Sequence, residues 1–295
     1  MSASSHYYVP EQSHWPIVAT IGLFLTLTGL GTVLVDGRLG QDPTMGWLMF
    51  GAGFVTMVYM LFGWFGSVAR ESMAGLYNDQ MDRSFRWGMM WFIFSEVMFF
   101  AAFFGALFYA RFYAVPNLAG DGSHEMTRLL WPEFKATWPL LQNPDPEKFP
   151  GPKSIIEPWS IPLLNTVLLL TSSVTITLSH HALRADKRKA AIGWLAATIA
   201  LGLVFLGFQI EEYVAAYTEH GLTLRSGIYG TTFFMLTGFH GMHVTLGAII
   251  LTVILVRLIR GHFTPDHHFG FEAASWYWHF VDVVWVCLFV FVYIM

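Results

Sequence analysis

The sequence predicts an all-α membrane protein with seven transmembrane helices. Three observations lead to this prediction. Of the 295 residues, 55% are hydrophobic and only 12% are charged, whereas a soluble domain is typically about 25% charged. The mean hydropathy is +0.50. Aromatic residues, which favour membrane interfaces, make up 17% of the chain.

Seven apolar runs are long enough for a helix to cross a bilayer, which takes about 20 residues. Their expected limits are 16–35, 44–69, 87–113, 159–183, 190–215, 229–258 and 272–294. Because a backbone in lipid must satisfy its own hydrogen bonds, runs of this length predict α-helices. Pro162 falls in the first turn of the fourth run, where a missing N–H is tolerated.

The basic residues predict how the helices are oriented. One side of the membrane carries nine of them near helix ends: Arg70, Arg83, Arg86, Arg184, Lys187, Arg188, Lys189, Arg257 and Arg260. The other side carries three apart from the long loop 114–157: Arg38, Arg111 and Arg225. Since basic residues favour the cytoplasmic side, we expect a cytoplasmic N-terminus and a periplasmic C-terminus.

The connections predict one transmembrane domain, residues 1–295, with its helices in two groups. The link Asp36–Asp42 is short, so the first two helices are expected to form a tight antiparallel pair. The longer link Arg70–Arg86 allows that pair to lie apart from the other five helices. The loop 114–157 is rich in Pro, Asn, Asp and Gly and is expected to fold over the outer face.

A lone carboxyl group interrupts the third apolar run at Glu96. At about 1.5 Å per residue, it lies roughly 15 Å from Arg86, near the membrane midplane. An acid is costly to bury there, which favours a functional role with a partner, a proton or a protein interface. The alternative is a neutral, hydrogen-bonded glutamic acid that only pins two helices together.

Two histidine-containing pairs lie at helical spacing. His240 and His243 are three residues apart, as are His279 and Asp282, so each pair shares a helix face. A metal or haem site is one interpretation. We favour hydrogen bonds between helices, which such residues commonly make in membranes. Gly238 and Gly241 are expected to let another helix approach closely.

The predicted cytoplasmic rim is rich in imidazoles and carboxylates. Its histidines are His6, His14, His180, His181, His262, His267 and His268. Since histidine titrates near neutral pH, this surface could collect protons, and an ordinary wet membrane rim is an equal alternative. Arg70, Arg257 and Arg260 could pair with lipid phosphates, or could simply anchor the helices on the positive side.

Several functions are disfavoured by what the sequence lacks. No lysine lies in an apolar run, which excludes a retinal Schiff base, and no glycine-rich phosphate loop occurs. The single cysteine, Cys287, excludes an internal disulfide framework and multi-cysteine metal sites. The net charge of −4 gives no reason to expect nucleic acid. The residues alone leave a transporter narrowly ahead of a subunit of a larger complex.

The motifs along the chain resemble subunit III of the haem–copper cytochrome c oxidases. They extend over nearly the whole sequence: His14–Pro16, Ala69–Ser72, Phe94–Phe100, Ile161–Thr166, Ser179–His181, Gly227–Phe234 and Thr237–His243. The most specific is the unbroken run His267–Trp285. The presence of the first two helices argues against the quinol oxidases, whose counterpart has five.

The resemblance implies a V-shaped arrangement of a two-helix and a five-helix group, with phospholipids in the cleft. Residues matching those near lipid headgroups are Arg70, Glu71, Arg257, Arg260 and His267. Glu96 matches the family's carbodiimide-reactive carboxylate. Residues matching polar core positions, with expected structural hydrogen bonds, are His240, His243, Glu272, His279 and Asp282. The histidines assigned to a proton-collecting surface are His6, His14, His180, His181 and His268.

The resemblance also implies an accessory subunit without catalytic residues, metal or haem of its own. Haem and copper belong to subunits I and II, its expected partners, and a small further subunit is allowed for. The chain would stabilise subunit I, support proton uptake and protect against turnover inactivation. The long loop 114–157 points to a bacterial inner membrane. The alternatives are a quinol oxidase subunit and an independent proton-coupled transporter using Glu96 and Asp282.

Overall fold

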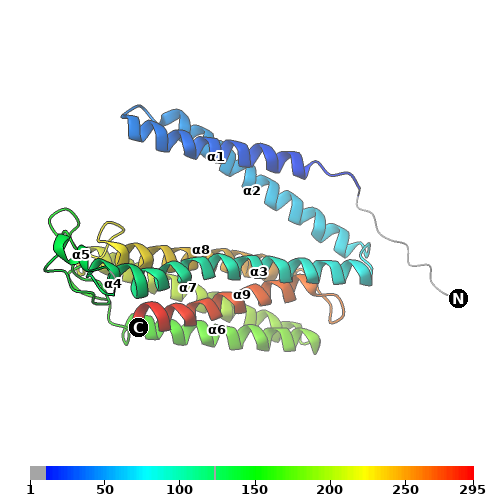
Figure 1. Cartoon of the computed structure of the whole chain (residues 1–295). Helices are drawn as coiled ribbons and strands as arrows, with labels where there is room; N and C mark the ends of the chain where they lie inside the picture. Colours follow the sequence, from blue (N-terminus) through cyan, green and yellow to red (C-terminus); the bar gives the residue numbers. More distant parts are fainter. Residues whose placement is uncertain (1–10, 123) are drawn as a thin grey trace. The chain divides into compact units, whose positions relative to one another are not determined.

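The computed structural model describes residues 11–122 and 124–295, and all regular structure within them is helical (Figure 1). Seven helical stretches are long and apolar enough to cross a bilayer, which confirms the predicted fold class. They are α1 Trp15–Leu39, α2 Thr44–Met73, α3 Asp79–Tyr109 with its continuation, α6 Ile161–Arg184, α7 Arg188–Thr218, α8 Ile228–Ile259 and α9 Phe269–Leu288 with its continuation.

Two of these stretches change their winding near one end. After α3, a π-helical turn η1 (Ala110–Ala114) leads into α4 (Val115–Leu118). After α9, the π-helical segment η2 (Phe289–Ile294) completes the last stretch. The short helix α5 (Glu125–Leu130) lies in the loop that follows.

Most helices extend beyond the apolar runs that predicted them. The largest difference is at α3, which begins at Asp79, while the apolar run begins at 87. Its first turn carries Asp79 and Asp82, which interact favourably with the positive end of the helix dipole. Helical backbone bonding therefore continues into polar residues that hydropathy alone assigns to a connection.

The chain divides into two compact units, Met1–Phe85 and Arg86–Met295. In the first, α1 and α2 form a hairpin that is packed through glycine. A Cβ atom on Gly29 would overlap the backbone of Phe50, and one on Gly53 would overlap that of Thr26. Small residues allow this close approach of membrane helices, which lets the two backbones touch.

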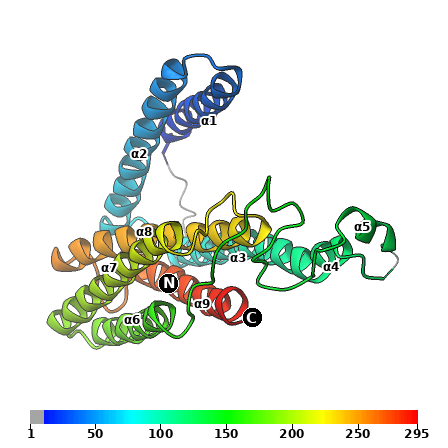
Figure 2. The same cartoon turned by 90° about the vertical axis from the view of Figure 1, so that its left-hand side faces the viewer.

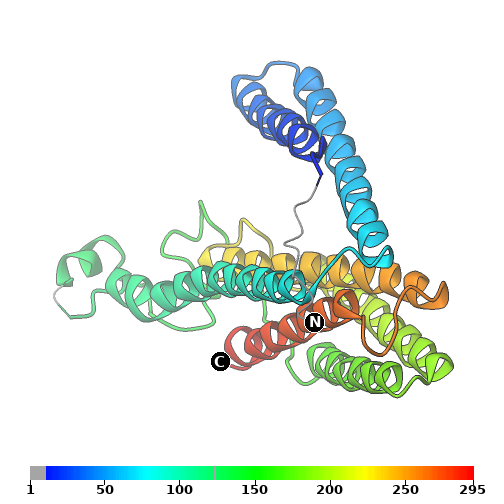
Figure 3. The ribbon, with the colours of Figure 1, turned by 90° about the vertical axis from the view of Figure 1, so that its right-hand side faces the viewer.

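The second unit is organised around α9. This helix packs against α8 on one side and α6 on the other, and α7 joins α6 to α8 (Figures 2 and 3). Trp278 of α9 is fully buried in a slot between Gly202 of α7 and Gly247 of α8. Its indole N–H donates to the Ser172 hydroxyl of α6 at 2.8 Å. One α9 side chain thus contacts three neighbouring helices.

Helix α3 joins this unit mainly through aromatic side chains. Phe99 packs against Phe239 of α8 at a centroid distance of 5.0 Å, and Phe92 lies 6.1 Å from Tyr277 of α9. The contact leaves room for long side chains between the helices, and the site described below lies there.

The loop 114–157 packs onto the second unit near the connection from α7 to α8. The buried amide of Asn143 donates to the carbonyl oxygens of Phe149 and Ser226 at 2.8 and 3.2 Å. The backbone N–H of Lys153 donates to the carbonyl of His220 at 2.8 Å. The loop is therefore fixed to this end of the bundle by buried polar contacts.

Candidate functional site

The carboxyl group of Glu96 pairs with an imidazole on another helix. Its Oε2 lies 2.8 Å from Nε2 of His243, so the contact joins α3 to α8. Nδ1 of His243 lies 2.6 Å from the carbonyl oxygen of Phe239. A carbonyl can only accept, so Nδ1 carries a proton. The hydrogen bond between Nε2 and Glu96 needs one further proton, which lies either on the carboxyl group or on Nε2. In both cases the net charge of the pair is zero.

This pair lies in apolar surroundings. The rings of Phe99 and Phe100 lie 5.9 and 5.0 Å from the His243 imidazole. The side chain of His243 is 6% exposed and that of Glu96 is 22% exposed. The geometry is suited to pinning α3 onto α8, and it also keeps an exchangeable proton within the span.

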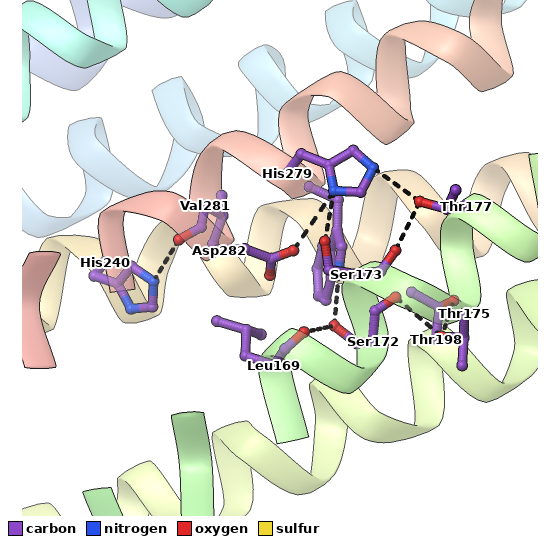
Figure 4. A network of polar contacts seen from close by, with 11 residues as sticks. Leu169, Ser172, Ser173, Thr175, Thr177, Thr198, His240, His279, Val281 and Asp282 are labelled. Carbon is purple, nitrogen blue, oxygen red and sulfur yellow. Dashed lines mark hydrogen bonds and ion pairs between the residues drawn. The ribbon is translucent and has the colours of Figure 1, made fainter. Parts of the chain in front are cut away.

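A second polar network links α9 to α6 (Figure 4). Nδ1 of His279 lies 2.6 Å from the Ser173 hydroxyl and 3.8 Å from Oδ2 of Asp282. Asp282 is buried, and among the described residues neither of its carboxylate oxygens has a hydrogen-bond partner. Buried polar groups normally have hydrogen-bond partners, so Asp282 is an exception in this network.

The histidines that could suggest a metal or haem site do not converge. Nε2 of His240 lies 3.2 Å from the carbonyl oxygen of Val281 (Figure 4). Both nitrogens of His243 have the partners described above. Within residues 11–122 and 124–295, neither histidine belongs to a group of three ligating side chains. The arrangement of both is that of hydrogen bonds within and between helices.

A further buried acid, Glu212 of α7, was not among the candidates predicted from the sequence. Glu212 is 2% exposed, and its Oε1 accepts hydrogen bonds from the Tyr293 hydroxyl at 2.6 Å and from Gln209 Nε2 at 3.2 Å. In the described part of the chain its second oxygen has no partner. The signal was present, because Glu211 and Glu212 both fall in the run 190–215. Only the structure shows that Glu212 is buried while Glu211 is exposed.

An ion pair and a histidine pair lie where α6 ends and α9 begins. Arg86 donates from Nη2 to Oε2 of Glu272 at 2.6 Å, which joins α3 to α9. Nε2 of His180 lies 3.1 Å from Nε2 of His268. Glu272, expected in the polar core, therefore lies at the end of the bundle with its side chain 20% exposed.

The other histidines of the expected proton-collecting surface do not join this group. His181 follows His180 on α6 and is exposed. His14 lies in the first unit, with its ring 4.3 Å from that of Trp15. His6 lies outside the described residues.

The residues matched to lipid headgroups are divided between the units. In the first, Arg70 donates to the Ser67 hydroxyl at 3.0 Å, and Glu71 accepts from the Tyr77 hydroxyl at 2.8 Å. In the second, the guanidinium of Arg257 lies 4.5 Å from the centre of the Phe263 ring, and its Nε is buried without a partner among the described residues.

Positive charge gathers around the C-terminal end of α8. Arg260 and the exposed His267 lie beyond the helix end. Arg188 donates to the last carbonyls of α8, from Nε to Leu258 at 3.0 Å and from Nη2 to Ile259 at 2.7 Å. Cations at a helix C-terminus interact favourably with its dipole. This end of α8 is a basic surface that could bind anions.

The fold and these contacts define a polytopic helical membrane protein whose buried acids and imidazoles are used between helices. The chain matches the family described as cytochrome c oxidase subunit III over residues 5–124 and 147–295. It is 39% identical to cytochrome c oxidase subunit 3 of Prototheca wickerhamii over 97% of this chain and 96% of that protein. The chain therefore belongs to the cytochrome c oxidase subunit III family.

Two further relatives have the same printed name. The protein from Arabidopsis thaliana is 38% identical over 97% of this chain and 95% of its own length. The protein from Cyprinus carpio is 36% identical over 99% of this chain and 98% of its own length. The resemblance stated from the motifs is thus confirmed, and family membership implies a complex with other oxidase subunits. A bacterial origin stays a prediction.

Proposed function

We propose that this chain is an accessory subunit of a cytochrome c oxidase, with no redox centre of its own. The observation that supports this most is the use of Glu96 and His243 in a mutual contact between α3 and α8. A neutral pair with both partners engaged stabilises helix packing. Haem and copper would then belong to subunits I and II, and this chain would pack on subunit I.

Support of proton uptake is the second part of the proposal. His180, His268 and Glu272 lie together and are each partly exposed, so protons from water can reach them. Imidazoles near neutral pH can take up and release protons. Such a group near the proton entry of subunit I would help to keep that entry supplied during turnover.

Phospholipid binding is the third part. Arg257, Arg260 and Arg188 concentrate positive charge at the end of α8, and Arg70 lies at the end of α2. Basic residues at a membrane surface attract anionic headgroups by about 1 kcal/mol each. Lipid bound at these basic residues would protect the complex from turnover inactivation.

Affinity purification of the chain from native membranes tests the accessory role. The chain is expected to copurify with haem-bearing partners. The purified sample should then show the visible absorbance spectrum of haem. A chain that purifies alone and transports protons after reconstitution would instead be a transporter. An intact complex whose haem is bound by this chain's own histidines would also overturn the proposal.

A further inference from the structure

Three metal-ligating side chains meet where α6 ends and α9 begins. His180 is in the last turns of α6, His268 directly precedes α9, and Glu272 is in the first turn of α9. One ligand atom from each lies within 4.8 Å of those of the other two. Of the described residues, these are the only three His, Cys, Asp or Glu side chains that could hold an ion together.

The contacts of His268 fix which of its ring nitrogens faces His180. Its Nδ1 lies 3.2 Å from the carbonyl oxygen of Thr264, which can only accept, so Nδ1 carries the proton. In the neutral ring, Nε2 then presents a lone pair to His180. Metal-bound histidines are commonly oriented in this way, with the second nitrogen donating to a carbonyl.

The distance between the two histidines fits a shared cation. Nε2 of His180 and Nε2 of His268 are 3.1 Å apart. Two nitrogens bound to Zn²⁺ at about 2.0–2.1 Å in tetrahedral geometry lie roughly 3.3 Å apart. An ion can therefore replace the proton between the rings with small side-chain movements.

The surroundings hold two of the ligands in place. The ring of Phe271 stacks on His180 at a centroid distance of 5.6 Å and an angle of 27°. Arg86 donates to Oε2 of Glu272 and so holds that carboxylate at the start of α9. All three ligands are only partly buried, so water can reach the group and complete a coordination shell.

We propose that His180, His268 and Glu272 bind one divalent cation of the Zn²⁺ type, with water as the fourth ligand. Two imidazoles and one carboxylate suit Zn²⁺ better than the oxygen-preferring Mg²⁺ or Ca²⁺. The ion would tie α6 to the start of α9, and it would share Glu272 with Arg86. The positive charge of Arg86 opposes the ion, which makes the site weaker than a closed structural zinc site.

Zinc binding to the intact complex containing this chain tests the proposal. The complex is freed of loose metal with a chelator and equilibrated with Zn²⁺, and bound zinc is measured per complex. Wild type is expected to bind one more zinc ion than either His180→Ala or His268→Ala. The zinc X-ray absorption spectrum of that ion should show two imidazole ligands.

Neighbouring histidines provide matched controls. His181→Ala and His267→Ala change an adjacent imidazole outside the group and should keep the extra ion. His268→Gln preserves side-chain polarity for assembly and should weaken zinc binding at least tenfold. Equal zinc content in wild type and the two alanine variants of the group would overturn the proposal. So would a loss of the ion in the controls, since general surface binding would then explain it.

Discussion

At the level of single residues, Glu96 is the most direct test of whether this chain packs helices or carries protons. Glu96→Gln keeps the side-chain shape, and its amide can donate to Nε2 of His243 while Nδ1 still donates to Phe239. We expect turnover and proton pumping close to wild type. The measurement is oxygen consumption together with proton release in reconstituted vesicles.

The matched variant Glu96→Ala removes the hydrogen-bond partner of His243. A buried nitrogen left without a partner costs about 1–3 kcal/mol, so the thermal stability of the complex should fall. A large loss of pumping in an assembled Glu96→Gln complex would contradict the packing role and indicate that the carboxyl proton is itself used.

His262 gives a prediction about pH. It lies beyond the end of α8, and burial of its ring, followed by the positive charges of Arg257 and Arg260, lowers its pKa below 6.5. Protonation of His262 is therefore less favourable in the folded state than in the unfolded chain. The free energy of unfolding should decrease as the pH falls below 6.5, because the unfolded chain then binds more protons.

The variant Arg257→Ala removes one of the two charges and should raise the pKa of His262 towards 6.5. An NMR titration of labelled histidine measures this shift, with Lys187→Ala as the control because Lys187 is not among the charges that act on His262. An unchanged His262 titration in Arg257→Ala would mean that burial and Arg260 account for the lowered pKa without Arg257.

The sequence shows which acidic residues lie in apolar runs and are candidates for burial. It does not show which of these candidates the folded protein buries. Glu96 stood out because it is alone in its apolar run. Glu212 did not, since it lies beside Glu211 and the sequence does not say which of the two faces the protein. The difference depends on the rotation of α7 against its neighbours, and this is set by side-chain packing along the whole helix.

At the level of helices, glycine determines how closely neighbours approach. Gly53 of α2 faces the backbone of Thr26 in α1, whereas a Cβ atom on Gly51 would meet nothing within 4 Å. Gly53→Val should separate the two helices at a cost of about 1–3 kcal/mol, as overpacking usually does. Gly51→Val is the control and should leave the hairpin intact.

Limited proteolysis of the connections in native membranes distinguishes these variants. We expect faster cleavage between α1 and α2 in Gly53→Val, and the same rate as wild type in Gly51→Val. Equal cleavage in both variants would mean that the glycine contact does not hold the hairpin together.

The helices themselves were predictable, and their contact faces were not. Long apolar runs gave all seven spans, since a backbone in lipid has no alternative to internal hydrogen bonding. A Cβ atom on Gly241 would meet nothing within 4 Å, so no helix of the described residues approaches it closely, and its use in close packing stays a prediction. Gly247, which lies later on α8, is the glycine that contacts Trp278 of α9. Apolar residues surround α8, so hydropathy does not show which side faces the bundle.

At the level of the whole molecule, the short link between the first two helices predicted the hairpin α1–α2, which the structure contains. The chain divides into its two compact units between residues 85 and 86, within α3. The close contacts of the second unit depend on residues far apart in sequence, such as Glu96 with His243 and Arg86 with Glu272. No local sequence pattern indicates that these residues are partners. The contacts of the candidate site could therefore be identified only in the structure.

The proposed lipid role makes a prediction for the complete complex. Arg70 and Arg257 belong to different units, and each is a basic residue in the last turn of its helix. Because each attracts an anionic headgroup by about 1 kcal/mol, Arg70→Ala combined with Arg257→Ala should bind phospholipid several-fold more weakly. The complex should then inactivate sooner during sustained turnover. Mass analysis of retained lipid and the time course of oxygen consumption measure the two effects.

A control with the same loss of charge separates specific binding from general surface attraction. Lys187→Ala with Lys189→Ala removes two positive charges around the turn between α6 and α7. If lipid is held at Arg70 and Arg257, only their double variant should lose both lipid and lifetime. If both double variants lose lipid equally, surface charge is the cause. Unchanged lipid content and lifetime in Arg70→Ala with Arg257→Ala would remove the basis for a protective lipid site, because a stabilising ligand must lose its effect when its binding groups are removed.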